Sequence, residues 1–342
     1  MFFTSDNAAP VPPEVLAALS EANTGYTPGY GTDAVTAAVQ DRIRAVLEAP
    51  EAVVHLVATG TAANALALAT LCPPWGAVFC HTHAHVQEDE CGAPEFFSAG
   101  AKLLQVEGAH GKMAPEALAR RIAMTGGSVH GVQRGALTLT NVTEAGTVYT
   151  PDETAALARI AHEAGVPVHL DGARFANAVA ATGASPADLT WRSGVDVLSF
   201  GGTKNGLMGV EAVVFFALDR AWEFELRRKR SGHLLSKGRY LAAQMGAMLE
   251  GNRWLDWAGH ANAMATRLAE GLKARGVTLW HPVQANILFA QWPAGTSARL
   301  RAAGARFYDA PAPEGYEAAR LVTSWSTTPE DVDGFLAALQ IS

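Results

Sequence analysis

The stretch TPDETAALARIAHEAGVPVHLDGAR, residues 150–174, decides the fold. Thr150 can cap a helix, because a threonine side chain accepts a hydrogen bond from an amide of the first turn. Pro151 stands at the first helical position, where the amide hydrogen it lacks has no partner within the helix. We expect the helix to end at Gly165 and a strand to follow over residues 166–170. The stretch therefore predicts a helix that leads directly into a buried strand.

The same succession of apolar run, turn and helix recurs along the chain. Further strands are expected at residues 53–57, 77–80, 102–106, 135–140 and 195–200, and within EAVVFFAL, residues 211–218. Helices of ten or more residues between strands are typical of parallel pairing, so we predict an α/β protein whose mainly parallel sheet has helices on both faces. In such sheets ligands bind beyond the carboxyl ends of the strands, and we look there for chemistry.

The last part of the chain has a different pattern. A long helical region over residues 219–275 is followed by two apolar segments, and a final helix is expected in TPEDVDGFLAAL, residues 328–339. Helices and a few strands without strict alternation predict a small α+β domain. We place the large domain at residues 1–255, N-terminal segment included, and the small C-terminal domain at residues 256–342.

Composition limits the classes of partner. Of the 342 residues 49% are hydrophobic and 17% are charged, which allows a large core. Acidic residues outnumber basic ones by 33 to 26, so we expect neither nucleic acid nor an anionic membrane as a partner. The three cysteines form no C-x-x-C pair, which argues against a disulfide framework. We see no signal peptide and no window approaching the roughly 20 apolar residues of a membrane span, and therefore expect a cytoplasmic protein.

The helix start after strand 53–57 could hold a phosphate. Thr59, Gly60 and Thr61 open this helix, and unpaired amides together with two hydroxyls suit an anion. An ordinary helix cap has the same pattern. The segment alone does not decide between the two interpretations.

Three histidines alternate after strand 77–80, at positions 81, 83 and 85. Alternate residues of an extended strand share a face but stand about 6.6 Å apart, which is wide for ligands of one metal ion. We therefore expect no metal site. A single imidazole stacked on a planar ligand demands less of the sequence.

A carboxylate and an amine follow two further strands. Asp171 comes after strand 166–170 beside small residues, which lets a bulky group approach, although a turn aspartate looks the same. Lys204 lies among the glycines of SFGGTKNGLMG, residues 199–209, which we interpret as room for a flat cofactor. A semi-buried lysine can be a Schiff-base nucleophile, although a loop lysine can also extend into solvent. Anion cradle, imidazole, carboxylate and amine on one sheet edge match the needs of pyridoxal phosphate.

The segment HLDGAR at residues 169–174, followed by Asn-Ala at 177–178, resembles the Asp-Gly-Ala-Arg segment of the threonine aldolase family. The resemblance extends from TSDNA at residue 4 to ARLVTSW ending at residue 325. It implies fold type I of the pyridoxal phosphate enzymes, that of aspartate aminotransferase. Supporting matches are YGTD at 30–33, TGTAAN at 59–64 and THAH at 82–85.

The resemblance also implies roles for individual residues toward pyridoxal 5'-phosphate. Lys204 would form the imine with the cofactor, Asp171 would hold the pyridine nitrogen, and His83 would stack on the ring. The remaining cofactor contacts would be Gly60, Thr61, Thr203 and Arg174.

The substrate carboxylate would be bound by Arg174 and Arg320, since arginine pairs with a carboxylate through two parallel hydrogen bonds, with a hydroxyl from Ser5 beside them. Fold type I enzymes generally build their sites across a dimer interface, so we expect a homodimer or homotetramer with shared active sites. A basic stretch at residues 227–239 could reach a neighbour's site, although basic runs are usually solvated helix ends. Candidates for this contribution are Tyr30, Lys237 and Arg239.

Two segments depart from the family pattern. Thr203-Lys204-Asn205-Gly206 stands where the commoner members have Ser-Lys-Gly, and TNVTEAG at residues 140–146 lacks the family's histidine. We look for a catalytic base at His85 instead, or in a water molecule held by His83 and Thr143.

The reaction that the resemblance implies is reversible cleavage of L-threonine or a related β-hydroxy-α-amino acid, phenylserine among the candidates, to glycine and an aldehyde. The alternatives are a β-eliminating lyase or an aminotransferase on the same fold. A more remote alternative is a non-catalytic metal-binding protein that uses the histidine cluster.

Overall fold

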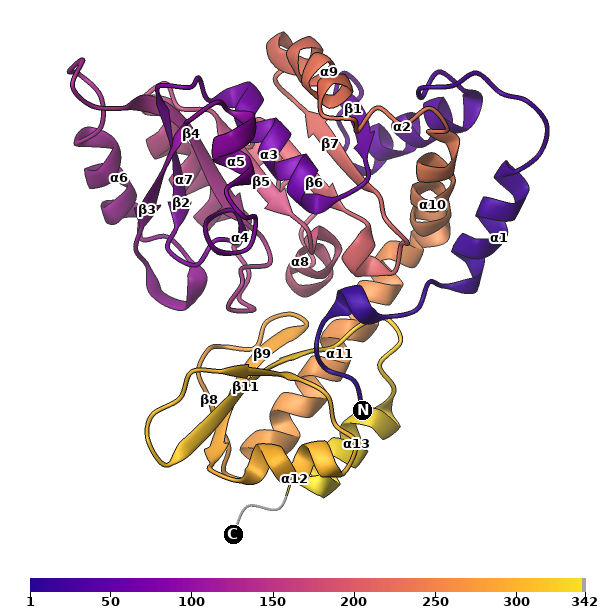
Figure 1. Ribbon diagram of the computed structural model, residues 1–342, viewed down its shortest axis with the longest axis vertical. Helices are drawn as coiled ribbons and strands as arrows, with labels where there is room; N and C mark the ends of the chain where they lie inside the picture. The colour runs from indigo at the N-terminus through magenta and orange to yellow at the C-terminus, as the bar shows by residue number, and fades with distance from the viewer. Residues whose placement is uncertain (340–342) are drawn as a thin grey trace.

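The computed structural model describes residues 1–339 and consists of a large and a small β-sheet, each covered by helices (Figure 1). The large sheet has seven strands in the order β1-β7-β6-β5-β4-β2-β3. Every predicted strand of this region is present, and no end differs from its prediction by more than three residues. The strands are β1 (Val53–Val57), β2 (Gly76–His81), β3 (Lys102–Val106), β4 (Gln133–Thr140), β5 (Val168–Gly172), β6 (Val197–Gly201) and β7 (Glu211–Phe215).

One strand of the large sheet runs against the others. β7 pairs antiparallel with both β6 and β1, while the remaining neighbours pair parallel. The connection from β6 to β7, residues 202–210, is too short for the helical crossover that a parallel partner requires. The predicted mainly parallel α/β sheet is therefore confirmed, with β7 as the exception.

Helices cover the large sheet on both faces, and the side chains of successive strand residues enter two separate cores. Leu170 and Val214 belong to one core, whereas Val197 and Val213 belong to the other. The helices are α1 (Pro13–Ala22), α2 (Ala34–Val46), α3 (Gly60–Leu71), α4 (His85–Glu88), α5 (Ala93–Phe97), α6 (Pro115–Ala123), α7 (Pro151–Glu163), α8 (Phe175–Thr182), α9 (Ala221–Arg230) and α10 (Arg239–Leu249).

The start of α7 is as the sequence predicts. The Thr150 hydroxyl accepts a hydrogen bond from the Glu153 amide at 3.2 Å, and the Glu153 carboxylate accepts one from the Thr150 amide at 2.8 Å. This reciprocal capping box satisfies two amides that a helix start leaves without helical partners. It fixes the start of α7, the helix that leads into β5.

The small sheet is antiparallel, in the order β10-β11-β9-β8, and packs on the long helix α11 (Arg253–Lys273). The predicted boundary between residues 255 and 256 falls inside α11, which runs from the large part into the small one (Figure 1). Phe3 is buried in the small core, so the chain's first residues also pack there. The other elements are β8 (Thr278–Leu279), β9 (Ile287–Pro293), α12 (Thr296–Ala302), β10 (Tyr308–Ala310), β11 (Tyr316–Val322) and α13 (Pro329–Ala338).

The division into domains at these residues stays a prediction. Among the helices of residues 1–339, none combines the length and the apolar character needed to cross a membrane. What matters for function is the place where the two sheets meet. The loop that follows β4 contacts Gln284 and Arg320 of the small part there.

Candidate active site

Asp171 lies near the carboxyl end of β5, opposite Thr140 of β4 and Ser199 of β6. Its side chain is buried, and one carboxylate oxygen accepts a hydrogen bond from the Ala173 amide at 3.0 Å. The other oxygen accepts one from the Asn64 side chain at 3.0 Å. Asp171 thus stabilises the turn after β5, as an ordinary turn aspartate would. Its carboxylate is at the same time held in place at the sheet edge.

Lys204 follows β6 in a single turn of 3-10 helix, η4 (Thr203–Asn205), and is partly buried. The two glycines before it are required by backbone packing. A Cβ atom on Gly201 would overlap the Ala173 carbonyl group, and one on Gly202 would lie 2.6 Å from the Val210 carbonyl oxygen. These close approaches to the backbone explain why both residues are glycines. The sequence interpretation, that the glycines leave room for a flat cofactor, is not needed to explain them.

Glu211, at the start of β7, holds the lysine loop. Its buried carboxyl accepts a hydrogen bond from the Gly202 amide at 2.6 Å and also pairs with the Thr203 hydroxyl. Burial raises the pKa of Glu211 to about 7 even though Lys204 is close by. The Thr203 hydroxyl further accepts a hydrogen bond from the Val210 amide at 3.3 Å, so it faces the lysine loop itself. Sequence reasoning missed Glu211, although an acidic residue opening an apolar strand was a signal.

His85 belongs to a polar chain that begins at Asp171. The Asn64 amide donates to both Asp171 and Glu90, and Glu90 lies 2.8 Å from the Nδ1 atom of His85. The hydrogen bond with Glu90 raises the pKa of His85 in spite of burial, and Asp171 acts in the same direction. The charge of Lys204 opposes this shift, which places His85 within electrostatic reach of the lysine.

His83 lies elsewhere. Its side chain is 69% exposed and pairs with Glu88 at 2.9 Å. The reason is local: β2 ends at His81, the chain turns, and α4 begins at His85, so the three histidines do not alternate along one strand. His81 is itself buried and accepts a hydrogen bond from the His83 amide at 3.0 Å. Among residues 1–339, no group of three or more His, Cys, Asp or Glu side chains is arranged to hold a metal ion.

The start of α3 combines a cap with open space. The Thr59 hydroxyl accepts a hydrogen bond from the Ala62 amide at 3.2 Å, which is the ordinary cap that the sequence allowed. The amides of Gly60 and Thr61 precede this capped position and belong to the first turn, which has no helical acceptors. A Cβ atom added to Gly60 would meet no atom within 4 Å. The helix start can therefore admit an anion.

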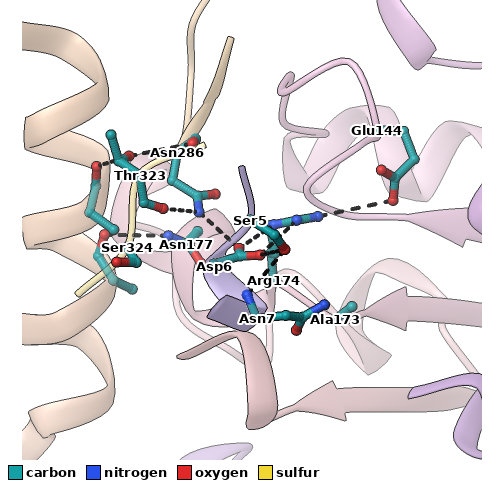
Figure 2. Close-up of polar contacts among 12 residues, drawn as sticks. Ser5, Asp6, Asn7, Glu144, Ala173, Arg174, Asn177, Asn286, Thr323 and Ser324 are labelled. Carbon is teal, nitrogen blue, oxygen red and sulfur yellow. Dashed lines mark hydrogen bonds and ion pairs between the residues drawn. The ribbon is translucent and has the colours of Figure 1, made fainter. Parts of the chain in front are cut away.

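Arg174 forms a buried ion pair with Asp6 from the N-terminal segment (Figure 2). Its Nε and one terminal nitrogen donate to the two carboxylate oxygens at 2.6 and 3.0 Å. Asn286 of the small part donates to the same carboxylate at 3.0 Å. Burial raises the pKa of Asp6, but the charge and hydrogen bonds of Arg174, together with Lys204 and Asn286, outweigh burial, and the pKa is lowered. Two of the three guanidinium nitrogens of Arg174 are thus engaged with the protein itself.

The third nitrogen of Arg174 lies 4.0 Å from Glu144, and Arg320 lies 3.7 Å from the same carboxylate. Ser5 is adjacent, with its hydroxyl 3.5 Å from Asp6 (Figure 2). The structure therefore brings together the three predicted substrate ligands, Ser5, Arg174 and Arg320. Sequence reasoning missed Glu144 among them, although it stands in the very TNVTEAG segment that was examined for a histidine.

Tyr30 and the two basic candidates lie around the start of α10. Tyr30 is 49% exposed, accepts the ammonium group of Lys229 over its ring at 4.7 Å, and donates its amide to Ser236. Lys237 is exposed, and Arg239 donates to the Gly25 carbonyl at 3.2 Å.

Comparison with known proteins identifies the family. A family model described as beta-eliminating lyase matches residues 3–293. A low specificity L-threonine aldolase of Pseudomonas aeruginosa is 46% identical to this chain, with 96% of this chain and 94% of the relative covered. The chain belongs to the threonine aldolase family of beta-eliminating lyases. A second threonine aldolase of low specificity, from a Pseudomonas species, is 43% identical and covers 95% of this chain and 93% of its own length.

The fold agrees with a solved threonine aldolase structure from Leishmania major. The TM-score is 0.94 at 29% identity, and the match covers 99% of this chain and 98% of the other. The predicted family and the predicted fold type I architecture are both confirmed by these comparisons.

Proposed function

We propose that this chain is a pyridoxal phosphate-dependent aldolase, a carbon–carbon lyase that cleaves L-threonine and related β-hydroxy-α-amino acids to glycine and an aldehyde. The relatives named L-threonine aldolase, at 46% and 43% identity over nearly the whole chain, support the reaction. The observation that carries the proposal is the arrangement of Asp171, on β5, and Lys204, in the turn after the neighbouring strand β6, with a pair of arginines close to the lysine. A cofactor site and a carboxylate site thus share one sheet edge.

The residues present fit pyridoxal phosphate. The open space at Gly60 and the free first-turn amides suit the phosphate, with Thr61 and Thr203 as further candidates. Lys204 would form the covalent link through its amine. When bound, the cofactor supplies a sink for the electron pair that is released when the Cα–Cβ bond breaks.

Asp171 would keep the cofactor's pyridine nitrogen protonated. Its two oxygens accept hydrogen bonds from Asn64 and from the Ala173 amide, which hold the buried carboxylate in one orientation. Asn64 also fixes the direction in which the carboxylate points. The same amide orients Glu90, so the pyridine end and the imidazole of the site are positioned by one side chain.

For the residue stacked on the cofactor ring, the geometry favours His85 over His83. His85 is linked to Asp171 through Asn64 and Glu90, whereas His83 is exposed and bound to Glu88. His85 is the first residue of α4, whereas His83 belongs to the turn before this helix.

Arg320 would be the principal ligand of the substrate carboxylate. Arg174 has one guanidinium nitrogen left for the substrate, because Asp6 occupies the other two. Fixing the carboxylate orients the Cα–Cβ bond, and such positioning accounts for a large part of the rate of many enzymes. Ser5 would add a hydroxyl group beside Asp6.

In a homodimer or homotetramer, Tyr30, Lys237 and Arg239 would contribute to a neighbouring copy's site. The support is their common place around the start of α10. Sedimentation velocity measures the oligomeric state. Mixing a variant substituted at Tyr30 with a variant substituted at Lys204 tests whether active sites are shared between chains. Activity returns in the mixture only if each site is composed of residues from two chains.

The decisive assay incubates the holoenzyme with threonine, allo-threonine and phenylserine and measures aldehyde and glycine against a 2-oxo acid and ammonia. Aldehyde and glycine in equal amounts support the aldolase. A 2-oxo acid that keeps the substrate's carbon skeleton, released together with ammonia, would identify a β-eliminating lyase: 2-oxobutyrate from threonine or phenylpyruvate from phenylserine. An amino-group transfer to an added keto acid would identify an aminotransferase. Lys204→Ala should abolish both turnover and the visible absorbance of the imine; a colourless, metal-containing wild type would instead favour the metal-binding alternative.

A further inference from the structure

Glu144 lies between two arginines and near the reactive lysine, in a loop whose backbone is fixed. The Thr143 amide donates to the Thr147 carbonyl and the Gly146 amide to the Thr143 carbonyl, both at 2.9 Å. Gly146 packs so closely on Ile287 that a side chain there would overlap its carbonyl group. The loop is therefore clamped against the small part of the molecule, and the freedom of Glu144 resides in its side chain.

The carboxylate of Glu144 is held loosely by comparison with that of Asp6. Its distances to Arg320 and Arg174 are 3.7 and 4.0 Å. Asp6, by contrast, pairs with Arg174 at 2.6 and 3.0 Å, and Figure 2 shows both carboxylates beside Arg174. The Glu144 side chain keeps 19% of its surface exposed. Asp6 is thus the structural partner of Arg174, and Glu144 is an anion that another anion can replace.

The two guanidinium groups need an anion between them. Burial and the neighbouring Arg174 charge lower the pKa of Arg320. Burial would raise the pKa of Glu144, yet the surrounding cations outweigh it and lower this pKa. These cations are Lys204, Arg174, Arg320 and His85.

A substrate bound through its carboxylate changes this balance. Its carboxylate takes over Arg320 and the free nitrogen of Arg174, and it brings a like charge close to Glu144. Glu144 must then leave the arginines, and it becomes a stronger base as it loses their charges. The nearest polar group of the substrate is the β-hydroxyl, because Cα is tethered near Lys204 and its carboxylate is fixed.

We propose that Glu144 is both the anion that the substrate carboxylate displaces and the base that then takes the β-hydroxyl proton. This inference rests on the proposed function. The β-hydroxyl O–H bond breaks and its proton passes to the Glu144 carboxylate. The oxygen forms the aldehyde C=O bond as the Cα–Cβ bond breaks, and that bond's electron pair is taken up by the bound cofactor. In the return direction the protonated Glu144 donates to the aldehyde oxygen.

The test compares the holoenzyme with Glu144→Gln, which keeps the size and removes the charge. Glycine, which has no β-hydroxyl, should bind about two- to fivefold more tightly to the variant by calorimetry, because the competing anion is gone. The kcat for threonine cleavage should fall by roughly 10²- to 10⁴-fold, the usual effect of losing a general base. Opposite changes in glycine affinity and kcat are not expected from a structural role.

Two further variants sharpen the test. Glu144→Asp should recover part of kcat, because a carboxylate is restored with a shorter reach. Asp89→Asn is the matched control: Asp89 is an exposed carboxylate whose charge also reaches Arg320, but it makes no ion pair there. It should change neither glycine affinity nor kcat.

Three results would overturn the inference. Weaker glycine binding in Glu144→Gln would mean that Glu144 helps the site to form rather than competing for it. A kcat of Glu144→Gln within threefold of wild type would exclude Glu144 as the base. An equal increase in glycine affinity in Asp89→Asn would show that any removed negative charge near the site has this effect. If wild type releases no aldehyde from threonine, the proposed function fails and this inference with it, whereas wild-type cleavage with an unaffected variant refutes the inference alone.

Discussion

Replacing Asp6 by alanine should destabilise the protein more than removing any surface carboxylate. Asp6 and Arg174 are both buried, with 0% and 2% of their side chains exposed, and the pair has bidentate geometry. Without Asp6 the guanidinium group stays in the interior without a close partner, since Glu144 is 4.0 Å away. Breaking a buried pair on one side costs about 3 to 5 kcal/mol, a large share of a typical folding free energy of about 5 to 15 kcal/mol.

The measurement is equilibrium unfolding in urea, with Asp333→Ala as the control. Asp333 forms the same bidentate pair with Arg267, at 2.9 and 2.8 Å, but on the surface, where solvent screens the charges. A much larger shift of the midpoint for Asp6→Ala than for the control is expected. Equal shifts would refute the reasoning, because burial would then make no difference to the pair.

The same variant has a defined pH dependence. The pKa of Asp6 is lowered in the folded state from 3.8, so the folded protein binds fewer protons at this site than the unfolded chain. The stabilisation is therefore complete above about pH 3.8 and is lost as the pH falls through the folded-state pKa. The difference between wild type and Asp6→Ala should accordingly stay constant near neutrality and shrink only in strong acid.

Three further predictions concern the site and its support. Glu90→Gln removes the hydrogen bond that raises the pKa of His85, so this pKa, followed by NMR of the imidazole, should fall; an unchanged value would contradict the polar chain. Gly201→Ala should destabilise the fold by about 1 to 3 kcal/mol, because its new methyl group would overlap the Ala173 carbonyl group. Gly60→Ala adds a methyl group in open space, so it should leave the urea midpoint unchanged and weaken only cofactor binding. Burial lowers the pKa of His169 from 6.5 to about 4, so on acidification the unfolded chain binds a proton at this site before the folded protein does. The free energy of unfolding therefore decreases as the pH falls from about 7.5 to about 5. His169→Gln should make this decrease smaller by roughly 2 kcal/mol, measured by urea unfolding at the two pH values.

How far the sequence could predict this protein differs between the sheet and the site. The strands were predicted from apolar runs and the helix start from Thr150, both of which depend on local chemistry, and no strand end differs from its prediction by more than three residues. The short loop between β6 and β7 could have predicted the antiparallel direction of β7. The stacking role of His83 came from the family resemblance, and the resemblance alone could not show that the chain turns after His81 and begins α4 at His85.

The residues that sequence reasoning missed are acidic side chains whose role depends on distant partners. The role of Glu211 follows from its hydrogen bond with the Gly202 amide, which only the fold brings about. Glu90 is held in place by Asn64, which lies 26 positions earlier in the chain. No local pattern encodes such pairs. The same holds for Asp6 and Arg174, which are 168 positions apart.

The carboxylate site joins three parts of the chain, and this has a consequence for how the protein recognises a substrate. Asp6 comes from the N-terminal segment, Arg174 from the large sheet, and Asn286 and Arg320 from the small one. Under the proposed function, recognition of the substrate would fall mainly to Arg320, whose strand belongs to the small sheet, because Asp6 occupies two of the three guanidinium nitrogens of Arg174. A bound carboxylate would then connect Arg320 with Arg174 in place of Glu144, while the buried Asp6 pair stays intact.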